Sequence, residues 1–145
     1  MYETILLPTD GSQNAQIATE RAVNVADQYD AELHALYVRE KTSDDPEVKG
    51  LDEKLTEELH QGRQILEDVE KQARKKDIVI ETVLETGVPR TVIEEYAADQ
   101  DIGLIIMGST GADSVPEKVL GTVSKYIVNE APADVFLIRP DSQLM

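Results

Sequence analysis

The residue types best suited to chemistry gather in one glycine-rich segment of the chain. Gly108 and Gly111 enclose two hydroxyl residues directly after the apolar run 103–107. Glycine has no Cβ, so such a backbone can approach a ligand closely and point N–H groups at an anion. Gly121-Thr122, ten positions beyond Gly111, adds a second small-residue turn and another hydroxyl. The segment suits phosphate binding; a tight strand-to-helix turn with a close helix–sheet contact explains the same glycines, and both interpretations stay open.

Two familiar phosphate motifs are missing. A P-loop needs Gly-Lys followed by Ser or Thr, whereas Lys118, the lysine near these glycines, follows Glu117. The dinucleotide fingerprint Gly-x-Gly-x-x-Gly is also absent, since the first turn after a strand-like run holds the single glycine Gly11. Ser12 and Ser109 lack a Gly-x-Ser-x-Gly elbow, so nothing marks an activated serine.

Metal and thiol chemistry find little support in the sequence. The chain has no cysteine, which excludes disulfides, thiolate zinc sites, iron–sulfur clusters and a cysteine nucleophile. His34 falls in a strand-like run and His60 in a helical pattern, and neither has a histidine partner four residues away. The sequence therefore predicts satisfied or exposed histidines rather than a zinc site. The acidic stretch around Asp44 and Asp45 does not match the spacing of a calcium loop.

Length and composition indicate one globular domain, residues 1–145. The hydrophobic fraction of 41% and charged fraction of 30% are ordinary for a folded protein. Apolar runs reach only four residues, as at 135–138, so no membrane span is expected. The first residues lack the basic and apolar regions of an export signal, so we expect a cytoplasmic location.

The charge balance is strongly acidic. The 29 Asp and Glu outnumber the 14 Lys and Arg, giving a net charge of −15, which disfavours binding to nucleic acids or anionic membranes. Seven of the acids lie on the predicted outer faces of helices: Asp52, Glu53, Glu57, Glu58, Glu67, Asp68 and Glu70. They indicate a solvated coat, and we hypothesise a host with high internal salt, where screening suppresses self-repulsion.

Strand-like and helical patterns alternate along the chain. Strands are predicted over 4–8, 32–38, 78–84, 103–107 and 133–139, with a long polar loop over 39–50. Helical spacing runs from Ala15 to Tyr29, from Leu51 to Ala73, from Pro89 onward, and from Val115 through Val119 and Val123 to Ile127. Ser12 suits an N-cap and Pro89 a first helical turn. The order predicts a doubly wound, Rossmann-like α/β domain with a five-stranded parallel sheet and four helices. Its ligand site is expected beyond the carboxyl ends of the first and fourth strands.

The spacing Gly108-x2-Gly111-x9-Gly121-Thr122 after the fourth strand resembles the ATP-binding motif of the universal stress protein family. Three further segments support the resemblance, which covers essentially the whole chain: Ile5-Leu-Leu-Pro8-Thr-Asp10-Gly-Ser12, Gly87-Val-Pro89, and Ala131-Pro132-Ala-Asp-Val-Phe-Leu-Ile-Arg139. The resemblance implies an adenine nucleotide alpha hydrolase-like fold that binds ATP with Mg²⁺ or Mn²⁺.

Site residues follow from the resemblance position by position. It implies that ribose and adenine are held by Pro8, Thr9 and Asp10, with Val38 against the base and Met107 and Gly108 beside the sugar. The phosphates would be cradled by Ser109, Gly111, Gly121, Thr122 and Val123. Asp10 also suits a helix cap and Val38 plain core packing, and those alternatives remain. Many relatives carry cations between the second and third glycines, whereas this chain has Asp113, Glu117 and a single Lys118, which weakens the expectation of tight binding.

The resemblance also implies a homodimer through the last strand, Val135, Phe136, Leu137 and Ile138, whose apolar edge a two-fold axis would bury. The leading hypothesis is a nucleotide-dependent stress or signalling switch. No general base, arginine finger or Walker lysine is evident, so any ATP hydrolysis is expected to be slow. An alternative is a dimeric protein-interaction module of the same fold without nucleotide. An adenylyltransferase is disfavoured because residues 10–12 lack its phosphate motif.

Overall fold

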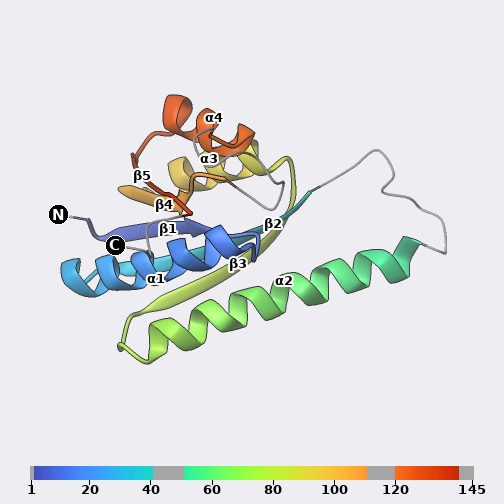
Figure 1. The fold of residues 1–145 in the computed structure, drawn as a ribbon, viewed down its shortest axis with the longest axis horizontal. Coiled ribbons are helices and arrows are strands. Elements are labelled where there is room, and N and C mark those ends of the chain that lie inside the picture. Colours follow the sequence, from blue (N-terminus) through green and yellow to red (C-terminus); the bar gives the residue numbers. More distant parts are fainter. Residues whose placement is uncertain (1, 41–50, 111–119, 141–145) are drawn as a thin grey trace.

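A computed structural model describes residues 2–40, 51–110 and 120–140, with residues 51–54 described in their backbone only. The elements follow in strict alternation (Figure 1): β1 (Thr4–Pro8), α1 (Gln13–Tyr29), β2 (Glu32–Glu40), α2 (Leu51–Arg74), β3 (Ile80–Gly87), α3 (Pro89–Asp99), β4 (Leu104–Gly108), α4 (Thr122–Glu130) and β5 (Asp134–Ile138). Ser12 caps α1 by accepting a hydrogen bond from the Ala15 N–H at 3.2 Å, and Pro89 opens α3, as the sequence predicts.

The five described strands form one sheet in the order β3-β2-β1-β4-β5, and every neighbouring pair is parallel. The chain builds outward from β1 to β3, then returns to the opposite side of β1 for β4 and β5. The predicted doubly wound α/β fold is confirmed. The direction of winding reverses between β1 and β4, where the carboxyl ends of the two strands diverge and leave room for a ligand.

Helices cover both faces of the sheet, α1 and α2 on one side and α3 and α4 on the other (Figure 1). Alternate residues of each strand serve the two cores: Ile5 and Leu7 pack toward α1 and α2, whereas Leu6 packs toward α3 and α4. All three are 0% exposed, so truncating any of them to alanine would cost about 2–5 kcal/mol. A strand buried on both faces explains the uninterrupted apolar run at the start of the sequence.

Several predicted boundaries are wrong. β2 continues to Glu40 and β3 to Gly87, which are paired residues, so the two strands extend each other beyond their apolar segments. The continuous helical pattern from Val115 to Ile127 does not form one helix: Gly121 is extended, with φ −64° and ψ 160°, and α4 begins after it. Val115 and Val119 lie outside the described residues, as does the rest of the predicted loop after Glu40.

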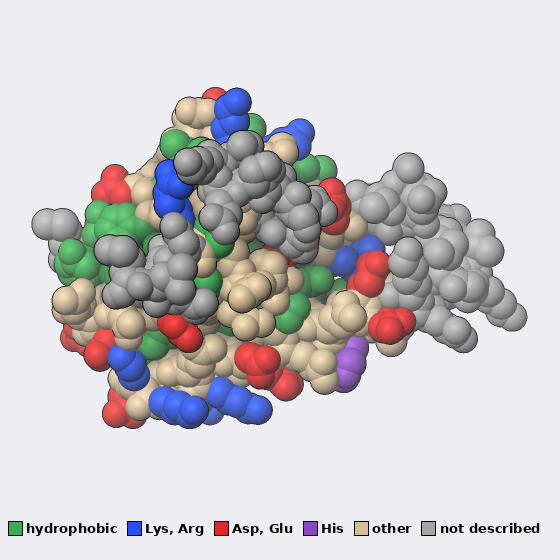
Figure 2. Space-filling model, viewed as in Figure 1, with side chains coloured by type: hydrophobic (Ala, Val, Ile, Leu, Met, Phe, Trp, Pro, Cys, Tyr) green, Lys and Arg blue, Asp and Glu red, His purple; other side chains and the backbone are tan. Residues whose placement is uncertain are grey.

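Acidic side chains are dispersed over the face of the molecule shown in Figure 2 and do not form one patch. Among the predicted acids of α2, Glu57, Glu67 and Asp68 are exposed and Glu58 and Glu70 half-buried, while the side chains of Asp52 and Glu53 lie outside the described set. These positions agree with a solvated coat. Within the described ranges, no helix combines the length and apolar character that a membrane crossing requires.

Candidate functional site

A pocket of about 440 Å³ opens at the carboxyl ends of β1, β2 and β4. Nine of the eleven predicted site residues line it: Pro8, Thr9, Asp10, Val38, Met107, Gly108, Gly121, Thr122 and Val123. Ser109 is 2% exposed and lies outside this lining, and its hydroxyl has no hydrogen-bond partner within the described ranges. Gly111 lies outside the described residues. The volume falls in the range of small-molecule and cofactor sites, about 300–1,000 Å³.

Part of the pocket lining is apolar. Besides the predicted Val38 and Met107, it includes Leu36, Pro89 and Ile93, which were not among the predicted site residues. Leu36 shares a face with Val38 by strand alternation, and Ile93 lies in the helix predicted to start at Pro89, so the strand and helix patterns could have indicated both residues. An apolar slot between a sheet end and a helix offers contacts to both faces of a planar ring.

The N-terminus of α4 also borders the pocket. Gly121 precedes the helix without a side-chain cap, and Thr122, Val123 and Ser124 of the first turn line the pocket. The Ser124 hydroxyl is not available to a ligand in the same way, because it donates a hydrogen bond to the Gly108 carbonyl at 2.8 Å. An uncapped helix N-terminus presents N–H groups and a partial positive charge, so this end favours an anion.

The turn after β4 is held tightly against α1. A Cβ at Gly108 would lie 2.7 Å from Asn14 Nδ2, so glycine is required for the close approach of helix and strand. Asn14 is 6% exposed, and its Nδ2 donates to the Thr110 carbonyl at 2.9 Å and to Thr110 Oγ1 at 3.1 Å. Gly108 therefore has a packing role against α1, and it also lies in the pocket wall.

Asp10 also combines the two roles raised from the sequence. Its Oδ1 accepts a hydrogen bond from the Ser12 N–H at 2.9 Å, which fixes the turn into α1. The same exposed residue lines the pocket. Asp10 is thus a capping residue by direct contact and a ligand candidate by position.

The pocket wall is acidic. Its charged members are Asp10 and Glu40, and none of its described lining residues is a lysine or arginine. Burial, followed by the negative charges of Glu58 and Asp10, raises the pKa of Tyr37, so this lining residue keeps its phenol proton. The described lining therefore offers an anion backbone N–H groups but no cationic side chain.

Comparison with known proteins identifies relatives over almost the whole chain. Residues 1–139 match the model of the Universal stress protein family. A universal stress protein of Methanocaldococcus jannaschii is 33% identical over 144 residues, which cover 96% of this chain and 83% of the relative. The solved structure of the universal stress protein UspA of Lactobacillus plantarum aligns with TM-score 0.77 and 34% identity, over 95% of this chain and 98% of that one.

Two solved structures with bound nucleotides share the fold at lower identity. A universal stress protein in complex with cAMP aligns with TM-score 0.74 and 23% identity, over 94% of this chain and 97% of that one. A universal stress protein family member of Arabidopsis thaliana with AMP bound aligns with TM-score 0.73 and 20% identity, over 94% of this chain and 90% of that one.

Proposed function

The chain belongs to the universal stress protein family, and we propose that it binds an adenine nucleotide in the pocket at the carboxyl ends of β1 and β4. The observation that carries the proposal is the convergence of segments far apart in sequence on one pocket, whose lining combines apolar side chains with a helix N-terminus. The apolar residues Leu36, Val38 and Ile93 suit a purine ring, and the uncapped N-terminus of α4 suits a phosphate.

We propose ATP with Mg²⁺ or Mn²⁺ as the physiological ligand. Gly121, Thr122 and Val123 would hold phosphate, while Thr9 and Asp10 would contact the sugar. Because Asp10 and Glu40 repel a polyphosphate, the divalent ion has to offset charge as well as bridge phosphates. AMP in one structure of the same fold and cAMP in another support the adenine part of the proposal.

We further propose that nucleotide occupancy biases a homodimer formed through β5. This strand is an edge of the sheet, and its apolar residues are incompletely covered: Phe136 is 39% exposed and Val135 and Leu137 are half-buried. Pairing with a second copy would bury the open edge. The described lining residues include no arginine finger paired with a positioned general base, so we expect a switch whose ATP hydrolysis is slow.

The first test is release of nucleotide from purified protein by denaturation, followed by chromatography. Calorimetric titration with AMP, ADP and ATP, each with and without Mg²⁺, then resolves the role of the cation. We expect saturable binding at one nucleotide per chain. Without Mg²⁺, affinity should fall as phosphates are added, because each brings more charge toward Asp10 and Glu40. Mg²⁺ should improve ATP binding most.

Failure of all adenine nucleotides to bind at high KCl with Mg²⁺ would overturn the proposal. The acidic wall formed by Asp10 and Glu40 is the feature that favours this outcome. It would leave a dimeric protein-interaction module as the better function.

A further inference from the structure

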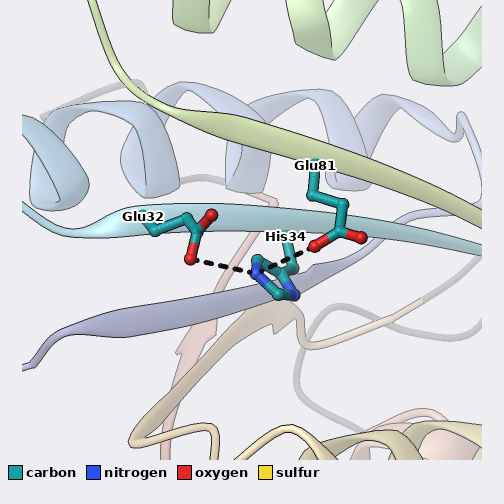
Figure 3. Close-up of side chains that lie close together, drawn as sticks. All are labelled: Glu32, His34 and Glu81. Atoms are coloured by element: carbon teal, nitrogen blue, oxygen red, sulfur yellow. Dashed lines mark ion pairs between the residues drawn. The ribbon is translucent and has the colours of Figure 1, made fainter.

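Three potential metal ligands meet on the α3 side of the sheet (Figure 3). Glu32 and His34 are alternate residues of β2 and therefore share a face, and Glu81 of β3 lies directly beside His34 in the strand register. His34 Nε2 lies 3.4 Å from Glu32 Oε2 and 3.4 Å from Glu81 Oε2. The three ligand atoms all lie within 4.8 Å of one another.

His34 is a buried side chain with one unsatisfied nitrogen. The residue is 4% exposed, and its Nε2 has no hydrogen-bond partner among the residues that the structure describes. The other ring nitrogen, Nδ1, lies 2.7 Å from the hydroxyl of Tyr96 on α3. A buried polar atom without a partner is costly, and this one points between two carboxylates.

We propose that Glu32, His34 and Glu81 bind a divalent transition-metal ion of the Zn²⁺ class. In a tetrahedral site with metal–ligand bonds of ~2.1 Å, neighbouring ligand atoms are about 3.4 Å apart. Both distances from His34 Nε2 to the carboxylates equal this separation. The carboxylate side chains are 44% and 58% exposed, so they can rotate to admit the ion and draw together around it. Water takes the fourth position.

Charge and tautomer agree with this assignment. Two carboxylates and a neutral imidazole carry −2, which a divalent ion neutralises. When the Nδ1–H of His34 donates to the Tyr96 hydroxyl, the lone pair of Nε2 is directed at the metal, the arrangement common to metal-binding histidines. A proton on Nε2 is the competing occupant, but charge-assisted hydrogen bonds to carboxylate are ~2.7–2.9 Å long, shorter than the 3.4 Å found here.

The site is distinct from the nucleotide pocket. None of its three residues belongs to the described pocket lining: Glu32 and His34 lie in the amino-terminal part of β2, whereas the lining on that strand starts at Leu36. Sequence spacing did not reveal it because its ligands come from two strands that become neighbours only in the sheet. His34 was expected to be satisfied or exposed, but it is buried and only half satisfied.

The test is calorimetric titration of the full-length, chelator-treated protein with Zn²⁺, in excess Mg²⁺ to occupy the acidic surface. Co²⁺ serves as a spectroscopic substitute, because its visible absorption reports a low-symmetry site with nitrogen ligation. We expect one strong site per chain. His34→Ala should abolish it, and Glu81→Gln, at an exposed position that leaves the fold intact, should weaken it by at least ~10-fold.

Matched controls separate the site from general charge effects. His60→Ala removes the other histidine, which is exposed on α2, and Glu85→Gln removes an exposed carboxylate from the strand that carries Glu81. Both should leave affinity within twofold of wild type. Tyr96→Phe should lower it by ~10–100-fold, as loss of an orienting hydrogen bond does in metal sites. Absence of a strong site, unchanged affinity in Glu81→Gln, or loss in His60→Ala would each refute the proposal.

Discussion

Adding a negative charge at the start of α4 should weaken nucleotide binding without lowering the stability of the fold. Thr122 is the first residue of this helix, is exposed and lines the pocket. In Thr122→Glu the new carboxylate lies at the helix N-terminus, where it interacts favourably with the helix dipole by about 0.3–1 kcal/mol. The melting temperature should therefore stay constant or rise by about 1–3 °C. The same carboxylate should repel a phosphate at these N–H groups and therefore weaken its binding strongly.

The size of this repulsion can be estimated from Coulomb's law. A carboxylate ~6 Å from a single phosphate charge, at an effective dielectric constant of ~20, is repelled by about 3 kcal/mol. The expected weakening is therefore about 100-fold in Kd for a mononucleotide. A polyphosphate carries more charge and should lose more unless a divalent ion compensates.

Gln13→Glu is the matched control, since it adds the same charge at the first residue of α1 without lining the pocket. The variants are compared by calorimetric titration with AMP and with ATP plus Mg²⁺. At ~0.15 M salt, the effect of each added charge is screened beyond ~8 Å. Gln13→Glu should bind almost as wild type. Equal affinities of Thr122→Glu and wild type, or equal losses in both variants, would show that phosphate does not approach the N-terminus of α4.

Four further results are expected. Gly108→Ala should lower the urea midpoint by the equivalent of about 1–3 kcal/mol, because its Cβ would lie 2.7 Å from Asn14 Nδ2; an unchanged midpoint would contradict the close approach. Burial and the charges of nearby glutamates raise the pKa of Tyr96 from 10.0 to about 12, so its contribution to stability is complete below pH ~10 and is lost as pH rises toward ~12. Chemical denaturation across that window should therefore show a steeper loss in wild type than in Tyr96→Phe. Phe136→Lys on β5 should shift sedimentation from dimer to monomer, whereas Val79→Lys, a 66% exposed position at the opposite edge of the sheet, should not; a monomeric wild type would refute the β5 interface. With a net charge of −15, the melting temperature should rise from dilute buffer to molar KCl, and a salt-independent melt would contradict the high-salt hypothesis.

The fold was predictable because the local sequence signals for strands, helices and caps agreed with one another. The apolar run at β1 and the cap at Ser12 needed no tertiary information, and alternation of strands and helices then restricts the topology. The predicted boundaries are wrong where strand pairing or backbone geometry determines where an element ends. Glu40 and Gly87 extend their strands because they pair with each other, and Gly121 interrupts a helical spacing that side-chain periodicity alone suggests is continuous.

The two candidate sites differ in predictability for a topological reason. Many residues of the candidate pocket lie at or after strand ends, and the carboxyl ends of parallel strands meet at one edge of the sheet, so the motif around Gly108 predicts where they converge. Glu81 meets His34 through lateral strand register, which the spacing within either strand does not reveal. Asn14 likewise gains its role only through packing of α1 on the turn after β4.

The excess of negative charge has a specific consequence at the two candidate sites. A dispersed acidic coat needs only solvent and counterions, but Asp10 and Glu40 line one pocket, and Glu32 and Glu81 flank a buried imidazole. Carboxylates brought together in this way repel one another and any anionic ligand, so we expect a bound cation to stabilise each place. The two cations should differ in kind. An oxygen-only setting beside phosphate suits Mg²⁺ or Mn²⁺, whereas the nitrogen of His34 favours a softer ion such as Zn²⁺. Selective loss of Zn²⁺ binding in Glu81→Gln, with Mg²⁺-dependent nucleotide binding intact, would therefore distinguish the sites.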